Sequence, residues 1–424
     1  MLAGPNLHLT YCTNIHPGET WLEVFKTLKE YILPIKENLA PDKEFGIGLR
    51  LSDVAANELL EANQLEVFIN WLQENRLYVF TMNGFPFGKF HHNKVKDDVH
   101  KPDWVTLERF NYTLNLVNIL THLLPDHGEG GISTSPLSYK PWFKNEKEDL
   151  ELVFNQATKN LLVLVEKLIS IKKETGKLIH IDIEPEPDGL LENSGEVISY
   201  FKDRLVPAGI KYLKKVLDYN PQQAESAIKE HIQICYDVCH FAVGYEKAFE
   251  VFEKFKKEGI KIGKIQISAA LKANIPKDEA ERNMLYEKFL PFVESTYLHQ
   301  VVARNENDGL TQYPDLPQAL ENLNKPNIEE WRIHFHVPIF MSKYSQLEST
   351  QIDIEEVLHQ NQKNPVTHHL EVETYTWEVL PTEDRLDLTH SIIRELTWVN
   401  MLLEGKKPFQ VWVKGKDSQS RFLF

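Results

Sequence analysis

The stretch KLIHIDIEPEPDG, residues 177–189, decides how the rest of the chain is interpreted. Isoleucine stands at every second position from 179 to 183, and the positions between and after carry His180, Asp182 and Glu184. A period of two places successive side chains on opposite faces of a β-strand, so this segment predicts a strand with one apolar and one ionisable face. Prolines at 185 and 187 predict that the strand ends there in a loop.

Composition restricts the classes of protein to which the chain can belong. Its 424 residues are 42% hydrophobic and 11% aromatic, enough for a large core. No apolar run reaches the roughly 18 residues of a membrane span, and residues 1–10 lack the pattern of a signal peptide. The three cysteines, Cys12, Cys235 and Cys239, are too few for a disulfide framework, so we expect a cytoplasmic protein. The net charge of −15 disfavours a nucleic-acid partner.

Strand patterns alternate with helix patterns along most of the chain. Apolar residues recur at helical spacing in residues 21–32, 65–75, 157–173 and 245–259. This alternation predicts parallel βαβ units, and eight such units close into a (β/α)8, or TIM, barrel of the α/β class. The eight strand candidates are residues 6–14, 45–52, 77–83, 130–136, 178–184, 232–238, 263–268 and 369–375.

Two more strand-like runs, residues 297–303 and 331–340, exceed the number that a barrel needs. We expect one barrel over residues 1–380, with residues 271–345 inserted between strands seven and eight. One of the extra runs could instead belong to the barrel. Residues 381–424 are expected to form a C-terminal helix and a tail that pack on the barrel.

Other predicted strands share the polar face seen in residues 177–189. Their apolar faces must contact the helices, so their polar faces point into the barrel. An unpaired buried charge costs on the order of several kcal/mol, so carboxylates inside a barrel require counter-charges. The candidates are Arg50, Lys264, protonated histidines or a metal ion. This answers why a strand carries ionisable groups along one face: they line an internal cavity.

Active sites of such barrels lie at the carboxyl ends of the strands. The sequence places Glu184 there, then Asp237 and His240 in YDVCH, then Gln266, then Glu373. Oxygen and imidazole ligands from successive strand ends suit Mg²⁺, Mn²⁺ or Zn²⁺. Each residue also has a purely structural interpretation: an ion-paired glutamate, an aspartate that caps a turn or a hydrogen-bonded histidine. Their occurrence at successive strand ends favours a functional site instead.

The same residues carry a resemblance to known proteins. The order Glu, Asp-x-x-His, Glu at the ends of strands five, six and eight resembles the xylose-isomerase-like barrels, which include sugar isomerases, ketose epimerases and nucleases of the endonuclease IV type. Spread over residues 6–380, the chain is similar to the EboE-type metabolite traffic proteins, a family encoded in gene clusters for secondary-metabolite export. The matching segments are LHLTYCTNIHPGE, FGIGLRLS, YVFTMNGFP, IDIEPEPDG, YDVCH and HLEVETYTW.

The resemblance implies a divalent metal (Mn, Zn or Mg) and a small-molecule metabolite as ligand, with other proteins of the gene cluster as possible partners. It also implies roles for particular residues. We expect metal ligands at Glu184, Asp237, Gln266, Glu373 and His336, catalytic roles for Glu184, Glu373 and His240, and substrate contacts from Arg50, Asn83, His8 and Lys264.

One departure from the sugar epimerases falls on strand seven. Where they have a metal-binding histidine, this chain has Gln266, whose amide oxygen is a weaker ligand for Zn²⁺ than imidazole. His334 or His336 of the inserted HFHVP segment is the alternative ligand. Glu186 and Asp188 are expected to be solvated loop acids or partners of Arg50.

Three functions remain open from the sequence. The first is a metal-dependent isomerase or epimerase that acts on a hydroxy-carbonyl metabolite. The second is a metabolite-binding carrier with a degenerate metal site, which the glutamine on strand seven favours. The third is a phosphodiesterase of the endonuclease IV type, which needs further histidine ligands and a basic groove.

Overall fold

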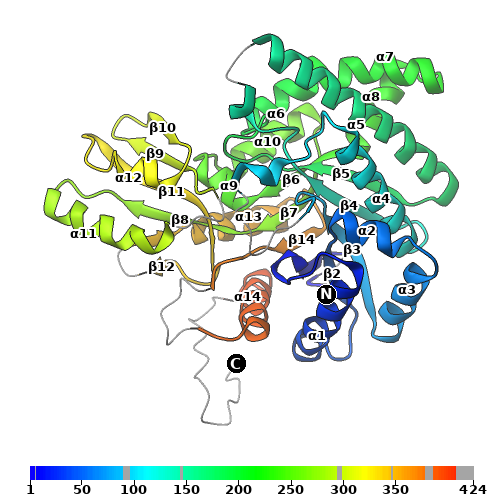
Figure 1. Ribbon diagram of the computed structural model, residues 1–424, viewed down its shortest axis with the longest axis horizontal. Helices are drawn as coiled ribbons and strands as arrows, with labels where there is room; N and C mark the ends of the chain where they lie inside the picture. The colour runs from blue at the N-terminus through cyan, green and yellow to red at the C-terminus, as the bar shows by residue number, and fades with distance from the viewer. Residues whose placement is uncertain are drawn as a thin grey trace.

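Eight parallel strands form one sheet in the computed structural model, which describes residues 1–4, 6–88, 96–143, 147–293, 298–344, 347–377 and 385–406. Their order is β1-β14-β7-β6-β5-β4-β3-β2, so the strands follow one another around a (β/α)8 barrel as expected (Figure 1). The strands are β1 (His8–Tyr11), β2 (Phe45–Arg50), β3 (Leu77–Asn83), β4 (Glu129–Thr134), β5 (Leu178–Ile183), β6 (Ile232–Asp237), β7 (Ile262–Ile267) and β14 (His369–Val372).

Threonine side chains help to close the barrel between β1 and β2. A parallel bridge joins Cys12 to Gly48 just after β1 ends. The hydroxyl of Thr10 donates to the carbonyl oxygen of Gly46 at 2.7 Å and accepts from the backbone N–H of Gly48 at 3.1 Å. The hydroxyl therefore replaces backbone hydrogen bonds between the first and second strands.

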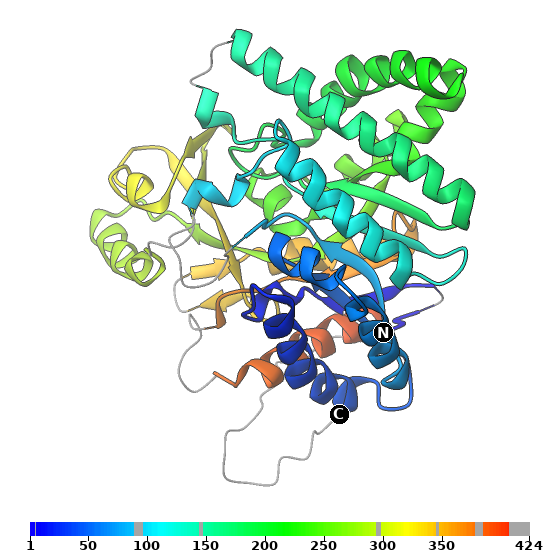
Figure 2. The ribbon, with the colours of Figure 1, turned by 45° about the vertical axis from the view of Figure 1, so that its right-hand side comes forward.

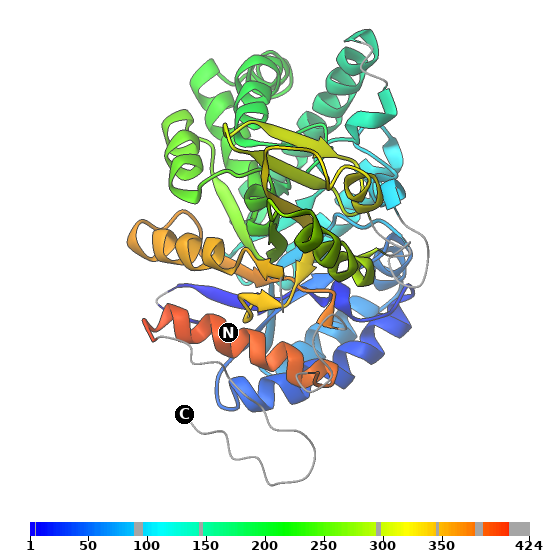
Figure 3. The same ribbon diagram turned by 90° about the vertical axis from the view of Figure 1, so that its left-hand side faces the viewer.

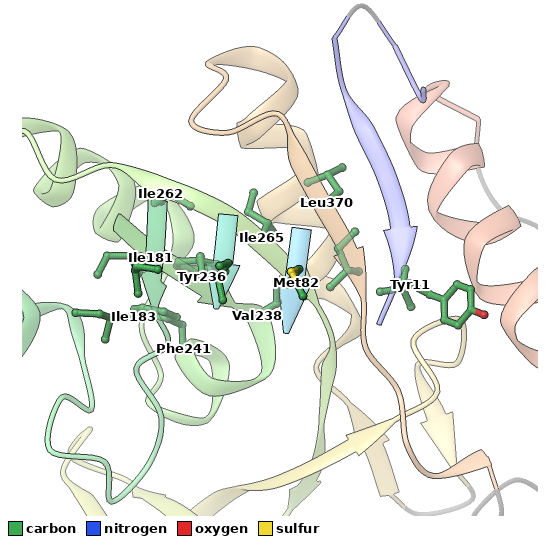
Figure 4. Packing of buried hydrophobic residues seen from close by; sticks show 14 of the residues in the cluster. Tyr11, Met82, Ile181, Ile183, Tyr236, Val238, Phe241, Ile262, Ile265 and Leu370 are labelled. Carbon is green, nitrogen blue, oxygen red and sulfur yellow. The ribbon is translucent and has the colours of Figure 1, made fainter. Parts of the chain in front are cut away.

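Helices cover the outside of the barrel, and α4 and α5 run side by side across it (Figure 2). The isoleucines of β5 are buried in one cluster with helix residues such as Leu161, as their alternation predicts. Figure 4 shows Ile181, Tyr236 and Ile265 among the packed side chains of this layer. The helices are α1 (Trp21–Leu39), α2 (Asp53–Leu59), α3 (Gln64–Glu74), α4 (Leu107–Leu123), α5 (Lys147–Thr175), α6 (Ser194–Tyr200), α7 (Val206–Leu217), α8 (Pro221–His231), α9 (Val238–Val243), α10 (Ala248–Glu258), α13 (Gln351–Lys363) and α14 (Leu388–Leu403).

A second, antiparallel sheet stands between β7 and β14 in the chain and beside the barrel in space (Figures 1 and 3). Its strand order is β10-β9-β11-β8-β13-β12, so neither extra run of the sequence belongs to the barrel. It begins and ends a few residues outside the expected 271–345. Its elements are β8 (Ala269–Asn274), α11 (Glu279–Phe289), β9 (Val301–Asn305), β10 (Leu310–Tyr313), α12 (Leu316–Leu320), β11 (Ile328–Val337), β12 (Lys343–Tyr344) and β13 (Leu347–Ser349).

Polar contacts fasten this inserted sheet over the carboxyl ends of the barrel strands. Lys96, which begins the short helix η2 (Lys96–His100), pairs with Asp315 at 2.7 Å. Gln300 donates to the carbonyl oxygen of Pro187 at 3.2 Å, beyond the end of β5. The insertion thereby forms a roof over the mouth of the barrel.

The C-terminal helix α14 packs beside α1, so the two ends of the barrel sequence lie together (Figure 1). The expected tail, from residue 407 on, lies outside the described residues. Within the described part of the chain, no helix has both the length and the apolar character that crossing a membrane requires.

The barrel interior is polar below the cavity, as the alternation of the strands predicts. The Lys264 ammonium lies 2.5 Å from the Glu371 carboxylate, and both side chains are wholly buried. A Cβ atom on Gly48 would come within 1.8 Å of Glu371 Oε1, so β2 needs glycine there to leave room for the carboxylate. Deeper in the barrel, His180 Nδ1 pairs with Asp182 at 2.6 Å.

Candidate metal centre and active site

A cavity of about 120 Å³ lies between the carboxyl ends of the barrel strands and the inserted sheet. Its barrel side is acidic, its roof is rich in histidine, and its remaining wall is apolar. The lining residues used below are Asn83, Phe85, Val99, His100, Glu184, Glu186, His240, His299, Gln300, His334, Phe335, His336, Glu373 and Tyr375.

Three carboxylates from separate strand ends meet where the barrel borders this cavity, and two of them, Glu184 and Glu373, line it. Glu184 follows β5, Asp237 ends β6 and Glu373 follows β14. One oxygen of each lies within 4.8 Å of the others, and their exposed fractions are 4%, 0% and 3%. The sequence predicted this convergence, and a group of this kind can hold a metal ion.

Glu373 is surrounded by hydrogen-bond donors. Its Oε1 accepts from the Asn14 amide at 2.7 Å, from the Asn83 amide at 3.3 Å and from the Tyr375 hydroxyl. These donors fix the orientation of the carboxylate. Asn83, predicted to contact substrate, therefore lies in the cavity wall and also holds a carboxylate.

Asp237 is oriented through one of its two oxygens. Its Oδ1 accepts from the backbone N–H of His240 at 3.1 Å, as the N-cap of α9, and from the Ser268 hydroxyl at 2.6 Å. Its Oδ2 is buried and has no hydrogen-bond partner among the described residues. The capping role and the site role therefore use different oxygens of the same side chain.

Glu184 has the least support of the three carboxylates. Its Oε2 is buried and lacks a hydrogen-bond partner within the described ranges. Burial, followed by the charges of Glu373 and Asp237, raises the pKa of Glu184 well above its ordinary value. Among the described residues, the ion-pair partners of these three carboxylates are histidines alone, His240 and His336. The group therefore lacks a permanent counter-ion.

The inserted sheet brings histidines to the barrel carboxylates. His336 Nδ1 lies 3.8 Å from Glu373 Oε2, and His336 forms a possible donor group with Asp237 and His240. His334 also faces the cavity, where burial and the neighbouring His240 lower its pKa well below the ordinary range. Burial likewise lowers the pKa of His240, so neutral imidazoles are favoured here.

Gln266 on β7 pairs in register with Asp237 of the carboxylate cluster on β6. It also pairs in register with Glu371, one inward-facing position deeper than Glu373, and is not among the described lining residues of the cavity. The residue of strand seven at the depth of Glu373 is Ser268, because Glu373 donates its N–H to the carbonyl of Ile267. Strand seven also contributes a serine that hydrogen-bonds Asp237, and Gln266 remains a predicted metal ligand.

Three residues predicted to contact substrate lie elsewhere. Lys264 is wholly buried against Glu371 beneath the cavity. Arg50 donates to the carbonyl oxygens of Gly18 at 3.1 Å and Gly88 at 2.5 Å, which holds loops together. His8 begins β1 at the opposite end of the barrel, where its Nδ1 lies 2.9 Å from the Tyr78 hydroxyl. These three assignments are corrected. The polar face of a strand predicts that a side chain points into the barrel, but it does not predict how far along the barrel axis the side chain lies.

Glu186 was expected to be a solvated loop acid, and the structure contradicts this. It is 6% exposed, lines the cavity and lies 3.3 Å from His100 Nε2. Burial, followed by the charges of Asp237 and Asp188, raises its pKa well above the ordinary value. His100, which the sequence reasoning missed, is also buried, and burial lowers its pKa to about 3. Asp188 is half-buried, with a pKa that burial raises to about 6.

Comparisons with known proteins give structural neighbours but no sequence relatives. No family model matches the chain, and no curated protein matches it. The IOLI protein with a bound zinc atom is 11% identical over 95% of this chain and 100% of its own, with a TM-score of 0.47. A D-tagatose 3-epimerase-like protein is 10% identical over 94% and 97%, with a TM-score of 0.47. A xylose isomerase-like TIM barrel protein from Mycobacterium smegmatis in complex with magnesium is 10% identical over 88% and 87%, with a TM-score of 0.43.

At such identities and TM-scores, the class of the protein rests on the geometry of its own chain. That geometry defines a (β/α)8 barrel with a carboxylate cluster at the carboxyl ends of strands β5, β6 and β14, roofed by an inserted antiparallel sheet.

Proposed function

We propose that the protein is a divalent-metal-dependent enzyme of the isomerase or epimerase type that acts on a small hydroxy-carbonyl compound. The observation that carries the proposal is the convergence of Glu184, Asp237 and Glu373 within 4.8 Å of one another at the border of a buried cavity. Three carboxylates this close repel one another unless a cation or protons neutralise them.

The donor set fits a hard divalent cation. Glu184 Oε2 and Asp237 Oδ2 are buried oxygens without hydrogen-bond partners among the described residues, and both belong to the cluster. An all-oxygen set suits Mg²⁺ or Mn²⁺, and His336 could add a nitrogen that also suits Zn²⁺. Bound there, such an ion would supply Lewis-acid polarisation of a carbonyl or hydroxyl oxygen.

The residues around the cluster divide the remaining work. Glu184, which has the least hydrogen-bond support of the three carboxylates, is the candidate to move a proton at the carbon beside the carbonyl. Glu373 has donors that fix it in place. Phe85 and Phe335 in the cavity wall exclude water from the proton transfer.

The resemblance of the sequence to the EboE-type proteins adds three features to this proposal. They are a role in metabolite traffic, a cytoplasmic location and partners from the same gene cluster. The carrier alternative uses the same cavity without chemistry. It is favoured by strand seven, where the resemblance implies a histidine ligand in sugar epimerases and this chain has Gln266.

Metal content and proton exchange test the proposal. Purified wild-type protein loaded with Mn²⁺ and desalted should retain the ion, and Glu184→Gln and Asp237→Asn should lose it. Glu395→Gln, which alters a buried carboxylate of α14 outside the cavity lining, is the matched control and should retain it. The loaded protein should also exchange a carbon-bound proton of a hydroxy-ketone for deuterium in D₂O, observed by NMR.

Two results separate the alternatives. Retention of Mn²⁺ by both cluster variants would show that these carboxylates do not hold it. Metal binding without exchange across a panel of ketoses and hydroxy-ketones, together with binding of one of them, would favour the carrier.

A further inference from the structure

The cavity holds a second group of possible ligands that shares no residue with the carboxylate cluster. It comprises Glu186, His240 and His334, and one donor atom of each lies within 4.8 Å of the others. Glu186 follows β5 in the loop, His240 lies on α9, and His334 lies on β11 of the inserted sheet. The three come from three different elements of the chain.

Hydrogen bonds fix both histidines with one nitrogen available. His240 Nδ1 lies 3.0 Å from the carbonyl oxygen of Pro185, which can only accept, so Nδ1 carries the proton. His334 Nδ1 lies 2.9 Å from Gln300 Oε1. The Gln300 amide nitrogen donates to the carbonyl of Pro187, which leaves Oε1 as an acceptor and places the proton of His334 on Nδ1 as well. Each imidazole therefore keeps its Nε2 lone pair.

This arrangement is the one in which metal-binding histidines are held in proteins, with Nδ1–H donated to a carbonyl oxygen and Nε2 left for the ion. Glu186 adds an independent observation. Its Oε1 lies 3.3 Å from His100 Nε2 but lacks hydrogen-bonding geometry, so this buried oxygen has no hydrogen-bond donor among the described residues. An unsatisfied buried carboxylate oxygen in a group with two imidazoles that each keep a lone pair points to a cation.

We infer that Glu186, His240 and His334 form a second divalent-cation site, selective for Zn²⁺, in the roof of the cavity. Two nitrogens and one oxygen suit a borderline-soft ion, whereas the carboxylate cluster suits harder ions. Three protein ligands leave further positions of the ion open to the cavity. The site goes beyond the proposed function and does not rest on it, and it gives the inserted sheet a purpose: β11 supplies a ligand.

Zinc stoichiometry in the full-length protein tests this inference. Chelator-stripped protein is titrated with Zn²⁺ by calorimetry, and bound zinc is measured after desalting. His334→Asn is the sharpest variant, because the asparagine amide can still donate to Gln300 while the Nε2 lone pair is lost. Glu186→Gln is the second variant, since it removes the charge at nearly the same volume.

The matched control is His231→Asn. His231 is buried and has its Nδ1 on a carbonyl oxygen, that of Ile179 at 2.7 Å, but it is not among the described cavity-lining residues. We expect the control to bind zinc as the wild type does. His334→Asn and Glu186→Gln should each lose one ion per chain. In the metal-free state, both variants should have a thermal unfolding midpoint close to that of metal-free wild type, which shows that they fold.

The variants also separate this site from the carboxylate cluster. Glu184→Gln should keep the ion that His334→Asn loses. If wild-type protein binds a single ion that only Glu184→Gln loses, the second site is refuted and the carboxylate site stands. If both His334→Asn and Glu186→Gln keep the wild-type stoichiometry, the inference is overturned. A single ion lost only in those two variants would support the inference and refute the carboxylate site.

Discussion

Ser268 Oγ donates to Asp237 Oδ1 at 2.6 Å and accepts from the backbone N–H of Cys239 at 2.9 Å. The hydroxyl therefore links the end of β7 to the start of α9 and occupies one oxygen of the aspartate. Asp237 Oδ2, the other oxygen, is left without a partner among the described residues, at the carboxylate cluster. A serine that the sequence reasoning passed over thus orients a candidate ligand.

Ser268→Ala should weaken Mn²⁺ binding at the carboxylate cluster by about 10- to 100-fold, because groups that orient a ligand contribute to metal affinity on this scale. Calorimetric titration of metal-free protein measures the change. Ser138→Ala is the control, since Ser138 makes a similar bond to Asp103 at 2.5 Å and neither residue is among the described lining of the cavity. Equal affinities for wild type and Ser268→Ala would show that the hydroxyl does not orient Asp237.

Lys264→Met should destabilise the protein by roughly 3–5 kcal/mol, because it leaves the Glu371 carboxylate buried without its cation. Urea unfolding followed by circular dichroism gives the free energy of unfolding. The double variant Lys264→Met/Glu371→Gln should recover a large part of the loss, since the uncompensated charge is then absent.

The control for this pair is Lys101→Met, which removes an exposed ion pair with Asp98 and should change stability by less than about 1 kcal/mol. If the double variant is no more stable than Lys264→Met alone, packing of the lysine rather than its charge accounts for the loss.

Glu395 should make the stability of the protein depend on pH. Its carboxyl is buried on α14 and accepts from the Ile339 N–H at 3.1 Å and the Thr374 hydroxyl at 3.0 Å. Burial raises its pKa to about 8, against about 4.3 in an unfolded chain. The protonated folded form therefore contributes its full stability below about pH 4.3, and this contribution is lost as pH rises through about 8.

Glu395→Gln cannot ionise and can still accept both hydrogen bonds. Its stability relative to wild type should increase between pH 5 and pH 8, by at most roughly 1.4 kcal/mol per pH unit, and should level off above pH 8. Unfolding midpoints of both proteins across this range measure the difference, with exposed Glu61→Gln as the control. A difference that stays constant with pH would contradict the expected protonation of Glu395.

The eight barrel strands, their order and the polar character of the interior could be predicted because each depends on a pattern within one segment. Alternation with period two assigned the isoleucines of β5 to the helix-facing side and Asp182 to the interior. The rule that active sites gather at the carboxyl ends of barrel strands placed Glu184, Asp237 and Glu373 together.

What the sequence by itself determined is therefore the side of the sheet that each residue faces and the end of the barrel at which it lies. Only the tertiary structure decided depth, because depth follows from the register between neighbouring strands, which the period of one strand does not contain. Register placed Gln266 beside Asp237 and Glu371, and Ser268 at the depth of Glu373, whereas Lys264 lies below the cavity. Only the folding of the inserted sheet over the barrel brought His334 to Glu186, since these residues lie far apart in the chain and no local pattern links them.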